Sequence, residues 1–107
     1  MSKCAIYNRY SVPNQNKMDE MRTAMVNHCK SLGISDYVLF EEIGSVLEKR
    51  EQFDEMMSRI QNREFTDLIV MHPDRLYKAT YDSQKFSEII ATINKNVTIH
   101  SVKKEND

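Results

Sequence analysis

The chain has 107 residues, of which 40% are hydrophobic and 29% are charged, an ordinary composition for one soluble globular domain. Its net charge of −1 argues mildly against a free-standing nucleic-acid-binding protein, and its two cysteines are too few for a disulfide framework. No apolar run approaches the roughly 18 residues that cross a bilayer, and the first segment is not a secretory signal, so we expect a cytoplasmic protein without a membrane partner.

Apolar periodicity predicts strands that alternate with helices. Short apolar runs are typical of buried strands, whereas apolar residues spaced three and four apart are typical of amphipathic helices. By these patterns we expect strands at residues 4–7, 37–40, 68–71 and 97–102. We expect helices over about 16–32, around the stripe at 53, 56, 57 and 60, and around the stripe at 86, 89, 90 and 93, entered near Thr80. Asn16 can cap the first helix and Gly33 can end it.

This alternation predicts an α/β fold, namely a three-layer domain with a mostly parallel sheet and helices on both faces. We expect the domain to span residues 1–104, followed by a charged tail at 105–107. The methionine-rich stripe of the first helix is interpreted as core packing. Ligands of such sheets bind outside the carboxyl ends of the strands, so the loops after the first three strands are where we expect a site.

The first of these loops begins with Tyr7, Arg9 and Ser11 in the pattern Y-x-R-x-S. Side chains of a strand alternate faces at about 3.3 Å per residue, so Arg9 and Ser11 would emerge on one face roughly 6.6 Å apart. One phosphodiester could contact both, with the hydroxyl as a nucleophile beside a guanidinium. Taken alone, the pattern also fits a strand end with an ordinary exposed arginine and serine.

The next two loops contribute further cations. Ser45 and Arg50 follow the second expected strand, and Asp74, Arg75 and Lys78 follow the third. With the arginine of the first loop, these cations can converge on one local site even though the chain is nearly neutral. Acidic residues can meanwhile lie elsewhere, for example Asp19, Glu20, Glu41 and Glu42. Only the topology of the fold decides between these arrangements.

Other chemistries lack the residues that they need. The only two glycines, Gly33 and Gly44, do not form a phosphate-binding loop for a nucleotide. The three histidines and two cysteines lack close metal-ligand spacing, so we expect no metal and no small-molecule cofactor. Cys4 precedes Arg9 closely but sits within an expected strand, where a thiolate phosphatase would need a phosphate-cradling loop.

These motifs resemble the N-terminal catalytic domain of the resolvase/invertase serine recombinases, especially those of mobile elements and phages. The resemblance runs from Ala5 to about Val102. Its residues are Tyr7, Arg9, Ser11 and Gln15, then Ile43-Gly44-Ser45 with Arg50, then Asp74-Arg75-Leu76 within His72–Lys78. It implies a site-specific DNA recombinase that cleaves and rejoins DNA through a 5′-phosphoserine intermediate without a metal. The implied partners are DNA and, in a full-length context, further copies in a dimer or tetramer.

The resemblance also implies a role for each residue. Ser11 would be the nucleophile, and Asp74 would orient a catalytic arginine. The arginines would stabilise charge on the phosphate oxygens and on the serine alkoxide; they are Arg9, Arg50 and Arg75. The residues expected to contact phosphate or DNA are Tyr7, Gln15, Ser45 and Lys78.

The sequence departs from the family pattern at several positions. Lys78 stands where the family has a second arginine, and an ammonium lacks the fork of a guanidinium. Glu20 stands about where a glutamine is expected, and an acid near a phosphate would repel it. These departures support an alternative: a catalytically weak or inactive recombinase-like module that binds a partner protein or regulates a full-length recombinase.

The family follows its catalytic domain with a long helix and a separate DNA-binding domain, and neither follows Lys104 here. We therefore expect either an excised catalytic domain or a natural short protein, with weak, salt-sensitive DNA binding and no recombination by this chain alone. A third alternative is a flavodoxin-like receptor that binds a small anion at the strand ends. That alternative leaves Arg50 and the Asp74-Arg75 pair unexplained.

Overall fold

Strands and helices alternate along the computed structural model, which describes residues 1–103. The elements are β1 (Cys4–Tyr10), α1 (Gln15–Ser31), β2 (Tyr37–Ile43), α2 (Glu51–Gln61), β3 (Asp67–Val70), the 3-10 helix η1 (Pro73–Arg75), α3 (Ser83–Asn94) and β4 (Thr98–Ser101). The last residue of the expected domain and the expected tail at 105–107 lie outside the described residues. Within residues 1–103, no helix is both long enough and apolar enough to cross a membrane.

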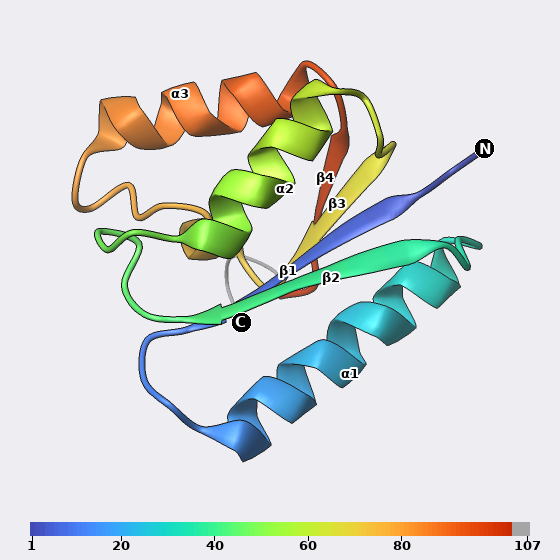
Figure 1. Cartoon of the computed structure of the whole chain (residues 1–107), viewed down its shortest axis with the longest axis horizontal. Helices are drawn as coiled ribbons and strands as arrows, with labels where there is room; N and C mark the ends of the chain where they lie inside the picture. Colours follow the sequence, from blue (N-terminus) through green and yellow to red (C-terminus); the bar gives the residue numbers. More distant parts are fainter. Residues whose placement is uncertain (104–107) are drawn as a thin grey trace.

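The four strands form one sheet in the order β2-β1-β3-β4, and each neighbouring pair is parallel. Helix α1 covers one face of this sheet, and α2 and α3 cover the other (Figure 1). The expected three-layer α/β architecture is therefore confirmed. Because every strand runs in the same direction, the loops that follow β1, β2 and β3 emerge at one edge of the sheet.

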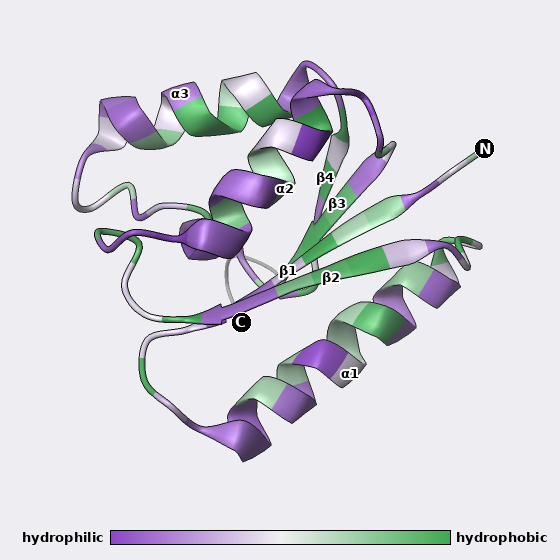
Figure 2. Ribbon diagram, in the orientation of Figure 1, coloured by the Kyte–Doolittle hydropathy of each residue, from purple (hydrophilic) through white to green (hydrophobic). Residues whose placement is uncertain are grey.

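Each face of the sheet has its own core cluster, and the strands between the helices are largely hydrophobic (Figure 2). On the α1 side, the cluster is built mainly from sulfur-containing side chains, which are Cys4, Met18, Met21, Met25 and Cys29. The cluster on the other side combines aliphatic side chains with four aromatic residues, which are Tyr7, Phe40, Phe53 and Phe65. The methionine stripe is thus core packing, as expected. Both cysteines are free, and burial raises the pKa of the Cys4 thiol to about 12.

The first two strands extend further than the apolar pattern predicts. β1 continues to Tyr10 and β2 continues to Ile43, because their parallel pairing runs on through Asn8 opposite Glu41 and Arg9 opposite Glu42. A ladder is built from backbone groups, so polar side chains at these positions do not end it. Arg9 therefore lies inside a strand, where its backbone is fixed.

The start of α1 also differs from the expectation. The helix begins at Gln15, and the capping residue is Asn14 instead of Asn16. Asn14 has extended backbone angles, and its side-chain oxygen accepts the backbone N–H of Lys17 at 3.0 Å. This bond satisfies a donor that the first turn leaves free. Gly33 follows the helix with a φ of 77°, a conformation that suits glycine, and ends α1 as expected.

The last helix begins later than expected, at Ser83 and not near Thr80. Asp82 caps it by accepting the backbone N–H of Lys85 at 3.0 Å. Strand β3 begins one residue earlier than expected, and β4 is shorter at both ends. The segment between η1 and α3 is consequently a loop, and it borders the site described next.

Candidate functional site

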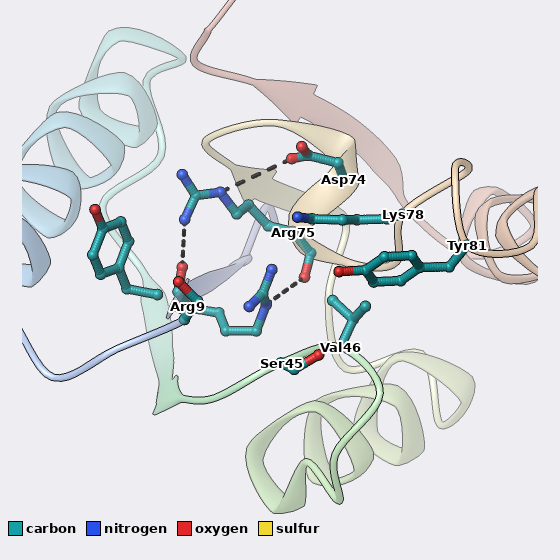
Figure 3. A pocket seen from close by; sticks show the side chains of 9 residues that line it. Arg9, Ser45, Val46, Asp74, Arg75, Lys78 and Tyr81 are labelled. Atoms are coloured by element: carbon teal, nitrogen blue, oxygen red, sulfur yellow. Dashed lines mark hydrogen bonds and ion pairs between the residues drawn. The ribbon is translucent and has the colours of Figure 1, made fainter.

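The loops after β1, β2 and β3 enclose a pocket of about 240 Å³ at the carboxyl edge of the sheet (Figure 3). The residues that line it are Arg9, Tyr10, Ser11, Ser45, Val46, Asp74, Arg75, Lys78 and Tyr81. Six residues that the sequence places at the site meet here, namely Arg9, Ser11, Ser45, Asp74, Arg75 and Lys78. Three others lie outside the lining: Tyr7, Gln15 and Arg50.

Of the two serines that line the pocket, Ser11 is the more exposed. It comes directly after β1, in a bend, so its position is set by the strand while its side chain remains exposed. Among residues 1–103, the pocket lining includes three cationic side chains, which are Arg9, Arg75 and Lys78. It includes one carboxylate, that of Asp74. The pocket is therefore locally positive although the chain has a net charge of −1.

Arg9 is held in place by backbone carbonyl groups. Only 4% of it is exposed, its Nε donates to the carbonyl of Arg75 at 3.1 Å, and its Nη1 donates to the carbonyl of Gly44 at 2.6 Å. Arg75 returns the contact, because its Nη1 donates to the carbonyl of Arg9 at 2.7 Å (Figure 3). Burial lowers the pKa of Arg9, and the positive charges of Arg75 and Arg50 lower it further. This exchange fixes β1 against η1.

Arg50 stands behind the pocket wall, at the N-cap position of α2, and is 7% exposed. Its guanidinium stacks on the ring of Phe53 at 3.8 Å. Its Nη1 lies 3.4 Å from the hydroxyl of Tyr7 and 3.5 Å from the carbonyl oxygen of Arg75. The Arg75 carbonyl thus accepts from both Arg9 and Arg50, and this shared acceptor gathers the arginines.

Glu42 lies outside the pocket lining, but it supports the site in a way that the sequence motifs did not indicate. Its carboxylate accepts a short hydrogen bond from the hydroxyl of Tyr7. It also accepts the backbone N–H groups of Gln52 and Phe53, each at 3.2 Å, at the start of α2. Arg50 makes no side-chain cap bond there, so Glu42 supplies the cap from the neighbouring strand.

Tyr7 is buried between these groups. Its exposed fraction is 0%, its ring packs edge-on against Phe53, and its hydroxyl lies between Glu42 and Arg50. Burial, followed by the hydrogen bond with Glu42, raises the pKa of Tyr7 above its usual range. In this arrangement the phenol has no access to a phosphate in the pocket.

The other expected acidic residues lie on or beside α1. Glu41 accepts hydrogen bonds from Asn8 and Arg22, each at 2.8 Å, on the α1 side of the sheet. Asp19 is exposed and accepts the side-chain amide of Gln15 at 2.7 Å. That hydrogen bond lowers the pKa of Asp19, and the contact with Arg22 lowers it further. Gln15 is thus engaged on the surface of α1, outside the pocket lining.

The third loop places Asp74 beside an arginine and a histidine. Its Oδ1 lies 3.9 Å from Nε of Arg75 and 3.1 Å from Nδ1 of His72. That histidine nitrogen accepts the backbone N–H of Asp74 at 3.2 Å, and within residues 1–103 the buried Oδ1 of Asp74 accepts no hydrogen bond. Lys78 extends along the other side of the pocket, with its Nζ 5.4 Å from the ring centroid of Tyr81.

Comparison with solved structures identifies the fold. The C-terminal catalytic domain of ISC1926 TnpA, an IS607-like serine recombinase, is 20% identical with a TM-score of 0.75, over 98% of this chain and 70% of that one. The first open reading frame of transposon ISC1904 from Sulfolobus solfataricus P2 is 24% identical with a TM-score of 0.79, over 97% and 69%. The N-terminal catalytic domain of TP901-1 integrase is 22% identical with a TM-score of 0.73, over 94% and 77%.

Sequence comparison extends this likeness to a family. No curated protein matches the chain. A family model described as the resolvase N-terminal domain matches residues 4–107, which confirms the resemblance found in the motifs. The chain therefore belongs to the resolvase N-terminal domain family, the catalytic domain of serine recombinases, which are a class of DNA recombinases.

Proposed function

We propose that Ser11 is the nucleophile of a site-specific DNA recombinase. Its Oγ forms a bond to the phosphorus of a DNA phosphodiester, and the bond from phosphorus to the 3′-oxygen breaks. The serine hydroxyl loses its proton and the departing 3′-oxygen gains one, leaving a 5′-phosphoserine and a free 3′-hydroxyl. One ester replaces another, so the reverse reaction rejoins DNA without an energy-rich co-reactant.

The observation that carries this proposal is the placement of the exposed Ser11 in one pocket with Arg9, Arg75 and Lys78. Attack on a phosphodiester concentrates negative charge on the non-bridging oxygens, and fixed donors stabilise that charge best when they need not reorganise. Arg9 and Arg75 are already oriented by carbonyl groups and retain further N–H groups for phosphate. Guanidinium groups can supply this stabilisation without a metal.

The remaining expected residues differ in how directly they can contact the phosphate. Ser45 and Lys78 line the pocket and can contact a phosphate directly. Arg50 and Tyr7 act from behind the wall, through the Arg75 carbonyl and through each other. Gln15 donates one amide N–H to Asp19, and its other N–H and its amide oxygen can contact DNA from the exposed start of α1. Asp74 orients Arg75 through their ion pair.

The chemistry also predicts the partners. One domain offers one nucleophile, so cutting both strands of a DNA site requires two copies, and exchange between two sites requires four. We therefore infer a dimer or tetramer on DNA in a full-length context. Free, buried cysteines suit the reducing cytoplasm, where the chain would act.

The test is covalent capture on DNA. A duplex with a 3′-bridging phosphorothiolate has an improved leaving group, so attack by Ser11 is favoured and rejoining is suppressed. With the domain in a full-length recombinase, we expect the parent and the exposed-position control Ser58→Ala to form an adduct, located at Ser11 by mass spectrometry. Ser11→Ala should form none while retaining the fold. An adduct in Ser11→Ala would exclude Ser11 as the nucleophile.

A further inference from the structure

Tyr81 is an exposed aromatic residue at the mouth of the pocket. It lies in the loop between η1 and α3, half of it is exposed (50%), and it belongs to neither core cluster. Tyr77, four residues earlier, is 5% exposed and packs inside. Burial of its ring therefore does not account for the position of Tyr81.

The ring faces the cationic side of the pocket. Figure 3 shows it beside Lys78 and Val46, across the pocket from Arg75. A turn in which the Tyr81 N–H donates to the Lys78 carbonyl at 3.0 Å brings the two side chains together, with the ammonium 5.4 Å from the ring centroid. An accessible aromatic ring thus stands next to cations that suit a phosphate.

We propose that Tyr81 is a stacking platform for the nucleobase next to the phosphate held in this pocket. The proposal rests on the proposed function. In a nucleotide chain every phosphate has a base within one sugar of it, and an aromatic ring beside a cationic groove is the arrangement that binds bases in single-stranded nucleic acids. Every base has a π face, so this contact would tolerate many sequences.

The proposal specifies the state of the DNA. A base inside an intact duplex is covered by its neighbours, so Tyr81 can stack only on a base that has left the helix or lies at an opened or frayed step. The domain would therefore prefer a distorted or opened cleavage site over a continuous duplex. Lys78, which contacts the same ring, can turn toward the phosphate when the base arrives.

A simpler role for Tyr81 makes a different prediction. If the ring only holds Lys78 in place, its removal weakens every phosphate ligand equally, whether or not that ligand carries bases. If the ring stacks on a base, its removal affects only ligands with bases. The two roles are separated by ligands of equal charge that differ only in their bases.

The experiment is an NMR titration of the isotopically labelled chain with the thymine deoxytrinucleotide and with its fully abasic analogue. We expect the base-bearing ligand to bind about tenfold more tightly to the parent, as is typical of one base stacked on an aromatic ring. Tyr81→Phe should keep this ratio, and Tyr81→Leu should reduce it to about one. Tyr37→Leu, which removes an exposed tyrosine at the start of β2, is the matched control and should keep it.

Each remaining outcome decides between the proposals. A tenfold ratio that persists in Tyr81→Leu, or equal weakening of both ligands in that variant, overturns the stacking role. A ratio of one in the parent also overturns it. The Arg75→Gln variant tests the phosphate pocket separately, because it should weaken both ligands by a similar factor. If Arg75→Gln changes neither, or if neither ligand binds the parent, the phosphate pocket fails and the stacking platform fails with it.

Discussion

Two groups of residues at the carboxyl edge differ in how firmly they are held. The support consists of the buried Tyr7, Arg9 and Arg50 with the half-buried Glu42, and the rim consists of the exposed Ser11 and Tyr81 with the half-buried Ser45 and Lys78. Support residues belong to β1, to the end of β2 and to the start of α2, and each makes hydrogen bonds to at least one other element. Rim residues belong to loops and remain partly or fully exposed.

This difference separates two tasks. The support keeps like charges close together, which is unfavourable unless carbonyl groups and the Glu42 carboxylate compensate them. The rim is free to exchange water for a ligand. Changes in the support should therefore alter stability as well as activity, whereas changes in the rim should alter ligand binding alone.

The largest loss of stability should follow removal of the Glu42 carboxylate. Glu42→Ala leaves the Tyr7 hydroxyl and two backbone N–H groups of α2 without an acceptor, so the free energy of unfolding should fall by about 3 kcal/mol. Urea denaturation measures it. Glu48→Ala, at an exposed position of the next loop, is the control and should change stability by less than about 0.5 kcal/mol. Equal effects of the two substitutions would show that the carboxylate does not hold the support.

Gly44 joins the support to the rim, and its substitution should have the next largest effect. Its φ is 137°, a region open to glycine, and an added Cβ would lie 2.8 Å from Oε2 of Glu48. The flexible Glu48 can move, so the backbone strain of Gly44→Ala should dominate, at about 2 kcal/mol. Gly33→Ala has open space and a φ of 77°, and should cost about 1 kcal/mol. Thermal unfolding ranks the two variants by their loss of stability. A larger loss of stability for Gly33→Ala than for Gly44→Ala would contradict the larger backbone strain that we assign to position 44.

Tyr7 should make the stability of the support depend on alkaline pH. Burial and then the hydrogen bond with Glu42 raise the pKa of Tyr7, so in the folded state the phenol stays protonated above about pH 10, where it ionises in the unfolded chain. Its contribution is complete below that pH and is lost as pH rises. Tyr7→Phe should cost about 1 kcal/mol at about pH 7, and this difference should shrink by about 1 kcal/mol near pH 11. Urea denaturation at both pH values checks this, with Tyr37→Phe as the control for loss of a phenol. Parallel pH profiles of the parent and Tyr7→Phe would contradict it.

The smallest effect on stability should come from the rim. Lys78→Arg should leave the free energy of unfolding within about 0.5 kcal/mol of the parent, because the side chain is partly exposed. It should tighten binding of the abasic trinucleotide about threefold, since a planar guanidinium can bind phosphate with two parallel bonds. Lys78→Gln should weaken it. NMR titration measures both, and weaker binding by Lys78→Arg would show that the pocket is shaped for an ammonium.

The layered fold and the sheet edge that carries the site were predictable from the sequence. Burial of each strand and of one face of each helix fixes the spacing of the apolar residues, and this spacing is visible in the local sequence. Element ends were less predictable. Asn14 and Asn16 are equally good caps in isolation, and only the backbone path chooses Asn14. The ladder likewise continues through Arg9 because backbone groups build it.

The candidate site was predictable only as a set of loops. Ser11 and Arg75 come together because parallel strands end at the same edge. The partnership of Tyr7 with Glu42 was missed, since it depends on the extension of β2 and on the approach of α2 across the sheet. Its one local signal is the position of Glu42 directly before the Ile43-Gly44-Ser45 motif.

The acceptor shared by Arg9 and Arg50 is a main-chain oxygen of residue 75. No side-chain substitution can delete that atom. The backbone conformation therefore determines where the two guanidinium groups bind. A change of the side chain at position 75 would remove its own donors to the phosphate and its bond to the Arg9 carbonyl, yet it would leave this acceptor for Arg9 and Arg50 in place.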